Sequence, residues 1–179
     1  REAQRDTFTP KDITTCAKTE SHAFPPPVYD GVYIWVPTAF GVTRISPSDC
    51  ELQEFPLESD PNPDFEASDL VYGEGHIWIA GNNQLYKLDR SGNIVLTTTV
   101  QSNAGIFAPS LLYTPGALWV AADKLYKLEP ATGAEINHYD QLTDQPVDWA
   151  YDGQTIWLAN NDNTVARIDA STGASLEPV

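Results

Sequence analysis

The chain has 179 residues and carries 10 Lys and Arg against 25 Asp and Glu, which gives a formal net charge of −15 at pH 7. This acidic balance argues against partners held mainly by phosphate contacts, so neither nucleic acid nor an anionic membrane surface is expected. Hydrophobic residues make up 41% of the chain and aromatic residues 11%, enough to build a folded core. No apolar run approaches the roughly 18 residues of a membrane-spanning helix, and we expect a soluble chain with no transmembrane segment.

The N-terminal region lies outside the pattern that fills the rest of the chain. The sequence begins at Arg1 and contains no Met, which is typical of a processed N-terminus. Its two cysteines, Cys16 and Cys50, have no Cys or His neighbours at the spacing of a zinc site. We therefore expect one disulfide that ties a tail of residues 1–24 to the segment ending near Cys50. Such a bridge indicates an exported protein, extracellular or periplasmic.

From residue 25 onward the sequence repeats with a period of about 40 residues. Every copy has a Trp in an apolar segment, a Tyr six residues before it and a Gly between the two. The tryptophans, spaced 43, 41 and 38 residues apart, are Trp35, Trp78, Trp119 and Trp157. A turn glycine follows in three copies, and Asp49 takes its place in the first, since Asp tolerates the left-handed conformation that such turns need.

Within each copy, four strand patterns alternate with turn residues. The second copy predicts strands over 69–72, 76–80, 85–88 and 94–100, and no segment shows a sustained helical period. Four-stranded units of this length predict an all-β fold, a β-propeller with one unit per blade. The expected blades cover about 25–57, 68–100, 109–140 and 147–179. They form either a small closed ring or part of a larger propeller.

The fourth copy carries a resemblance to known repeats. Its segment from Ile156 to Asp169, followed by Ser171, Thr172 and Gly173, resembles the blade motif of bacterial YVTN-type propellers and of the related virginiamycin B lyase-like and NHL repeats. The third copy is similar, and the resemblance spans most of the chain. It implies the fold more than an activity, because these motif residues are structural. Members of that group usually have six or seven blades, whereas four are visible here.

The repeated aromatic and basic residues are interpreted as structural. The Trp and Tyr residues lie in buried strands, so packing between blades is expected rather than sugar binding, and Trp149 is expected in the core. A base follows each Trp by 8 to 10 residues, with a hydroxyl or carboxylate two residues further on, and we expect these groups to pair between blades. The bases are Arg44, Lys87, Lys127 and Arg167.

Two groups of residues are candidates for binding. Nine residues before the Trp, where each innermost strand begins at the channel mouth, stand Asp69, Ser110 and Asp148, with Pro26 in the first copy; they could hold a cation or a polyol. In the loop between the first two blades, Asp60, Asn62 and Asp64 alternate like the first ligands of a calcium loop. The remainder of that motif is missing, which favours a solvated acidic loop. No cofactor is expected, and calcium or magnesium would be the candidate ion.

The three histidines give little indication of catalysis. The lyase branch of the resembled group implies a histidine, a glutamate and magnesium, and His22, His76 and His138 match no such motif. We therefore predict a non-catalytic, exported module that binds a protein or a small ligand. The alternatives are a metal-assisted propeller enzyme of lyase or lactonase type, and a structural subunit of a larger extracellular assembly, including an oligomer that completes a ring.

Overall fold

The computed structural model describes residues 25–38, 41–57, 67–81, 84–100, 109–140 and 146–177. These residues form four antiparallel sheets, each of four strands that are paired in chain order. The first blade consists of β1 (Val28–Tyr29), β2 (Ile34–Thr38), β3 (Gly41–Ile45) and β4 (Leu52–Pro56). The second consists of β5 (Ala67–Gly73), β6 (His76–Gly81), β7 (Gln84–Leu88) and β8 (Ile94–Thr99). The third consists of β9 (Ser110–Thr114), β10 (Ala117–Ala121), β11 (Leu125–Leu128) and β12 (Glu135–Tyr139). The fourth consists of β13 (Pro146–Tyr151), β14 (Thr155–Asn160), β15 (Val165–Asp169) and β16 (Ser175–Leu176).

The all-β prediction is confirmed, and the strands of the second blade differ from the expected ranges by at most two residues at an end. Within the described ranges there is no helix, and thus none long and apolar enough to cross a membrane.

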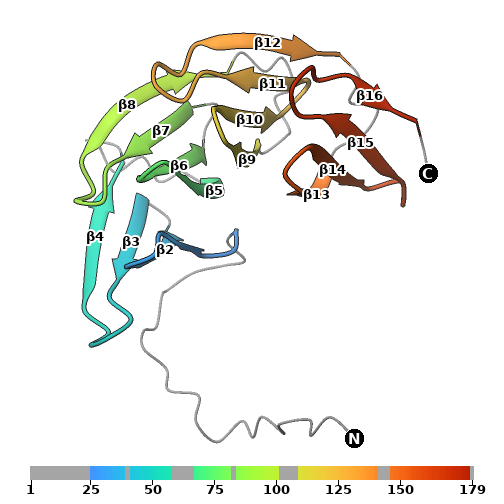
Figure 1. Ribbon diagram of the computed structural model, residues 1–179. Helices are drawn as coiled ribbons and strands as arrows, with labels where there is room; N and C mark the ends of the chain where they lie inside the picture. The colour runs from blue at the N-terminus through green and yellow to red at the C-terminus, as the bar shows by residue number, and fades with distance from the viewer. Residues whose placement is uncertain are drawn as a thin grey trace, which may run out of the picture.

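The blades follow one another along an open arc (Figure 1). The innermost strands line the concave side, while β4, β8, β12 and β16 form the outer rim. The first and fourth blades stand at opposite ends of the arc, apart from each other. The described residues therefore do not form the small closed ring that was one of the two predicted arrangements.

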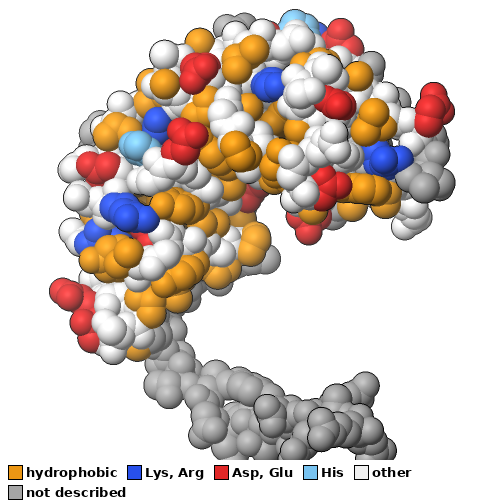
Figure 2. All heavy atoms as spheres, viewed as in Figure 1, with side chains coloured by type: hydrophobic (Ala, Val, Ile, Leu, Met, Phe, Trp, Pro, Cys, Tyr) orange, Lys and Arg blue, Asp and Glu red, His pale blue; other side chains and the backbone are white. Residues whose placement is uncertain are grey.

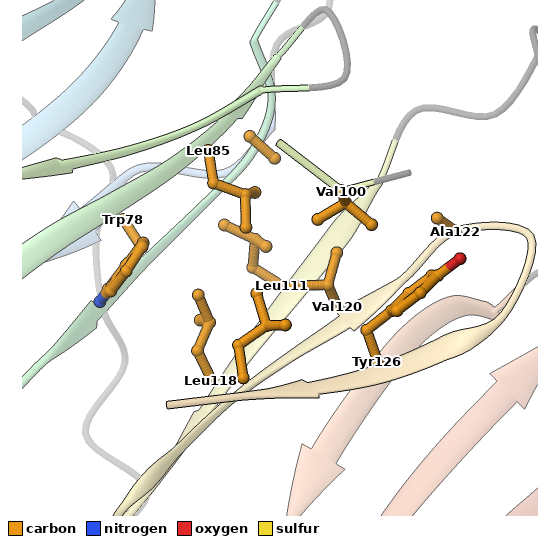
Figure 3. Packing of buried hydrophobic residues seen from close by; sticks show 10 residues of the cluster. Trp78, Leu85, Val100, Leu111, Leu118, Val120, Ala122 and Tyr126 are labelled. Atoms are coloured by element: carbon orange, nitrogen blue, oxygen red, sulfur yellow. The ribbon is translucent and has the colours of Figure 1, made fainter. Parts of the chain in front are cut away.

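Three hydrophobic clusters hold neighbouring blades together. Between the second and third blades, Trp78 and Leu85 pack against Leu111, Leu118 and other side chains of the third blade (Figure 3). Equivalent clusters join the first blade to the second and the third blade to the fourth. The inner strands of the second and third blades are apolar on both faces because each of these two sheets is covered by a blade on either side.

The repeated tryptophans occupy these clusters as predicted in the first three blades. Trp35, Trp78 and Trp119 are fully buried, whereas Trp157 in the last blade is only partly buried. Trp149 is also partly buried and packs against the third cluster. Burial of these large rings is a main source of the stability of the arc.

In the first, third and fourth blades, the residue five positions before the repeated Trp accepts a hydrogen bond from the indole, a pattern that the sequence analysis missed. The Trp35 Nε1 atom donates to Asp30 Oδ2 at 3.0 Å, and Trp157 Nε1 donates to Asp152 Oδ2 at 2.9 Å. In the third blade the acceptor is a Thr hydroxyl. The second blade has Gly73 instead, because a Cβ there would lie 2.1 Å from a tyrosine ring of the third blade.

The left-handed residue of the first blade's outer turn is Cys50, not Asp49. Cys50 has φ 60°, and its N–H donates to Ser46 O at 2.9 Å, as the N–H of Gly133 donates to Glu129 O at 2.8 Å. The expectation for Asp49 was wrong by one position, because this turn is one residue longer than the turn of the second blade. Asp49 instead accepts the N–H of Glu51 through its side chain.

Candidate functional site

Asp69 is the most perturbed of the predicted channel-mouth residues. Its carboxylate is largely withdrawn from water at the start of the second blade's innermost strand, and this burial raises its pKa to about 6. Asp69 Oδ2 accepts the N–H of Leu111 in the third blade at 2.6 Å, and Oδ1 accepts the N–H of Leu70 at 2.8 Å. These two hydrogen bonds oppose the rise in pKa, and the charge of Asp148 adds to it.

The structure brings Asp69, Ser110 and Asp148 to three consecutive innermost strands, β5, β9 and β13, which contact one another in that order. Asp148 is exposed, and its Oδ1 accepts the N–H of Trp149 at 2.8 Å. Pro26 is exposed just before β1 and offers no polar side chain. The three polar residues thus share one edge of the concave side, as the sequence predicted, with one carboxylate partly buried and the other open to water.

Asp69 acts in this geometry as a tie between blades. Both of its oxygens accept backbone N–H groups, one from its own strand and one from the next blade. Ser68 beside it donates to Pro109 O, also in the next blade, at 2.7 Å. In the parts of the chain that are described, no three His, Cys, Asp or Glu side chains gather closely enough to hold a metal ion.

Several predicted residues lie outside the described ranges. The calcium-like loop with Asp60, Asn62 and Asp64 is among them, as are Cys16 and His22. The calcium site and the Cys16–Cys50 disulfide therefore stay predictions.

The repeated bases of the first three blades do connect neighbouring blades, but their partners there are main-chain carbonyls. Lys87 Nζ donates to Pro130 O in the third blade at 2.7 Å, and Lys127 Nζ donates to Ala170 O in the fourth at 3.0 Å. Arg44 likewise donates to Arg90 O in the second blade. Each acceptor lies three positions after the base of the following blade, in that blade's outer turn. Pairing with a hydroxyl or carboxylate side chain, as predicted, is not what these bases do.

The acidic residues two positions after the bases order their own turns instead. Asp169 Oδ1 accepts the Ser171 hydroxyl at 2.6 Å and the N–H groups of Thr172 and Ser171 at 2.8 and 2.9 Å, and these contacts lower its pKa to about 2. Asp89 accepts from Asn93 in the same way. Because these carboxylates accept hydrogen bonds from donors within their own turns, they do not pair with a base from another blade.

Each base also lies over the tryptophan of its own blade. The distance from Lys127 Nζ to the Trp119 ring centroid is 5.0 Å, and from the Arg167 guanidinium carbon to the Trp157 ring centroid it is 4.9 Å. In the first three blades the cation is therefore held between an aromatic face and a carbonyl of the next blade.

The two described histidines make contacts with residues close to them in the chain. His76 Nδ1 lies 2.8 Å from Glu74 O in the adjoining turn. His138 Nδ1 lies 2.7 Å from Glu135 Oε1 on the rim strand β12. Neither contact involves Asp69 or Asp148.

The fold places the chain among β-propeller structures. It superposes on the crystal structure of BamB from Moraxella catarrhalis with a TM-score of 0.62 and 15% identity, covering 86% of this chain and 47% of that one. For the Pan2 WD40 domain of Neurospora crassa the TM-score is 0.67 with 17% identity, covering 87% and 47%. For the computationally designed protein Ika8 it is 0.66 with 13% identity, covering 84% and 47%. The chain thus spans about half the length of these structures, and at such identities the likeness establishes the fold alone.

Sequence comparison gave no corresponding result. No protein-family model matches the chain, and no curated protein sequence matches it either.

Proposed function

We propose that the chain is a non-catalytic scaffold that binds another protein. The observation that carries this proposal is the use of the repeated polar groups: the bases, Asp69 and the indole acceptors all hold blades or turns in place. A frame fixed in this way leaves its rim and loops to present side chains to a partner. The proteins with similar folds include the Pan2 WD40 domain, and WD40 repeats form β-propellers.

The rim offers apolar contacts for such a partner. Val95 in β8 and Ile136 in β12 are 50% and 52% exposed. Each is the unpaired residue of a β-bulge, where the register between the rim strand and its neighbour shifts. The bulge turns corresponding side chains outward in two adjacent blades. The acidic charge of the chain favours a partner whose surface around this contact is basic.

The proposal is tested with the double variant Val95→Asp, Ile136→Asp. A partner first captured by the unaltered chain is purified, and its affinity for both forms is measured by calorimetry. We expect the double variant to bind at least about tenfold more weakly, because two apolar contacts are replaced by charges. Val32→Asp is the matched control, since Val32 is 48% exposed in the turn between β1 and β2. Equal weakening by the control, or none by the double variant, would contradict a binding site on the rim.

We further propose that the repeats are of the YVTN, virginiamycin B lyase-like or NHL type and that the protein is exported. The sequence motifs and the two cysteines support these proposals. Mass spectrometry of unreduced peptides should find Cys16 linked to Cys50. Recovery of both as free thiols from the native source would contradict export.

A further inference from the structure

The three junctions inside the arc are built on one plan. Every blade has a forward face, which turns toward the next blade, and a back face, which turns toward the preceding one. The forward faces of the first three blades are at most 3% exposed at Trp35 and Val42, at Trp78, Ala80 and Leu85, and at Trp119, Ala121 and Leu125. The back faces that meet them are as well buried at Ile77 and Ile79, at Leu118 and Val120, and at Ile156 and Leu158. Each interior junction is therefore a dry apolar contact between a forward face and a back face.

The forward face of the fourth blade has the same residue pattern and no blade against it. Trp157 is partly exposed, Ala159 is exposed, and Val165 is 61% exposed, although their counterparts in the other blades are buried. Figure 2 shows hydrophobic side chains at the surface at this end of the arc, beside a basic side chain. Asp152, which accepts the Trp157 indole N–H, is also exposed, whereas its counterpart Asp30 is covered by the second blade.

In the described ranges, Arg167, on the forward face of the fourth blade, lacks the turn carbonyl of a following blade that the other bases have as a partner. The bases of the first three blades donate to a turn carbonyl of the next blade, while Arg167 Nη1 donates to Glu177 O of its own blade at 3.1 Å. Arg167 Nε is buried and has no hydrogen-bond partner among the described residues. A stranded donor of this kind is costly, and a turn carbonyl of a following blade would satisfy it.

The complementary surface is present at the other end of the same chain. On the back face of the first blade, Ile34 and Val36 are partly exposed, while their counterparts in the other blades are fully buried. Thr43 and Ile45 on β3 are already buried, so the contact area open to a partner lies over β2. The residue three positions after the base of the first blade is Pro47, and in the interior junction formed by Lys87 the acceptor is likewise a proline carbonyl, that of Pro130.

We propose that two copies of this chain associate through this pair of faces. The forward face of the fourth blade of one copy packs on the back face of the first blade of the other, and Arg167 donates to Pro47 O. A twofold axis makes this junction twice and closes a ring of eight blades. The arc itself spans 47% of the length of BamB, of the Pan2 domain and of Ika8, so two copies would match the length of these three chains, whereas one copy spans 98% of the designed protein Ika4. This inference is independent of the rim scaffold.

The turn around Cys50 fits such a junction. In the interior junctions a glycine at this position leaves room for a rim side chain of the preceding blade: a Cβ on Gly92 would lie 2.0 Å from the Phe55 ring, and one on Gly173 would lie 1.8 Å from Tyr139. Phe55 on β4 pairs with Val42 on β3, and Val42 lies two positions before Arg44, the base of that blade. In the fourth blade β16 pairs only with Arg167 and Ile168, so its described part places no side chain there. The Cβ of Cys50 can occupy that space.

The test is the mass of the chain in solution, by light scattering after size exclusion, without reductant. We expect twice the monomer mass of 19.7 kDa at micromolar concentration and no larger species. X-ray scattering should give a radius of gyration of about 21 Å, as for a compact particle of that size. Val165→Asp, or Ala159→Arg as a second variant, should raise the dissociation constant by at least about a hundredfold, because a charge enters an apolar junction twice per ring.

Val95→Asp is the matched control, because Val95 is also a half-exposed valine on a strand but lies on the rim. It should leave the mass unchanged. A chain that stays monomeric at about 100 µM with native circular dichroism would overturn the proposal. Dimers that resist both junction variants, or a ladder of larger oligomers, would overturn it as well.

Discussion

Asp30 and Asp152 make the same hydrogen bonds in opposite surroundings, which allows the contribution of burial to be measured. Asp30 Oδ1 accepts the N–H groups of Val32 and Tyr33, and Oδ2 accepts the Trp35 indole N–H. Asp152 repeats this pattern with the corresponding residues of the fourth blade. Asp30 is 1% exposed, whereas Asp152 is exposed to water. We predict that Asp30→Ala destabilises the chain far more than Asp152→Ala does.

The expected loss follows from the groups that Asp30 leaves behind. Two main-chain N–H groups and the Trp35 indole N–H lose their acceptor, and Arg90 loses the carboxylate that lies 3.6 Å from its Nε. Burial alone would raise the pKa of Asp30, but these hydrogen bonds and the charge of Arg90 outweigh it and hold the pKa below its usual value. Stranding these donors should cost about 3 to 5 kcal/mol of the free energy of unfolding, or about 10 °C in melting temperature. Around Asp152, water can replace the lost acceptor.

The assay is urea denaturation followed by circular dichroism, at pH 7. Both substitutions are made in the Val165→Asp background, so that association of two copies does not cover Asp152. Asp30→Asn serves as a control of shape, and it should lose less than Asp30→Ala because the amide oxygen still accepts a hydrogen bond. Equal losses for Asp30→Ala and Asp152→Ala would refute the argument from burial.

Three further predictions concern the frame. The Asp69 carboxyl should titrate near pH 6 in an NMR titration, and a midpoint below pH 4 would contradict this. Because the pKa in the folded chain is raised above the usual 3.8, the contribution of Asp69 to stability is present at pH 4 and is lost as the pH rises through 6. Gly92→Ala should lower the free energy of unfolding by about 1 to 3 kcal/mol more than Gly75→Ala. Both have φ near +80°, but only Gly92 faces a ring, so equal effects would mean that the ring moves aside. Lys87→Met should lower the free energy of unfolding by about 1 to 3 kcal/mol, because the hydrogen bond from Lys87 to Pro130 O is lost. An unchanged urea midpoint would show that this hydrogen bond contributes nothing to stability.

The blades were predictable because their periodic residues perform the same packing in every copy. A Trp at a spacing of about 40 residues, with turn glycines between apolar runs, is enough to indicate four four-stranded sheets. The arrangement of the blades was not predictable in this way. Whether four units close or stay open depends on the angle between successive sheets, and no single residue type encodes that angle.

The polar contacts were harder to predict, because their partners lie on another blade or on the main chain. The bases were recognised, but a carbonyl acceptor such as Pro130 O leaves no mark in the sequence. The indole acceptors did leave a signal, since Asp30, Thr114 and Asp152 all stand five residues before a Trp. Gly73 interrupts the series and obscures it. The channel-mouth residues lie together because they occupy corresponding positions in successive innermost strands, and their role in binding stays a prediction.

Pairing within each blade joins only strands that are adjacent in the sequence, so a sheet can be completed as soon as its own 40 or so residues have left the ribosome. The base of that blade must then wait for the next turn to be synthesised before its ammonium or guanidinium finds a carbonyl. A blade without a successor therefore has an unsatisfied cation and a partly uncovered tryptophan on its forward face, as the described part of the fourth blade has, and both groups can bind a following blade once it is present.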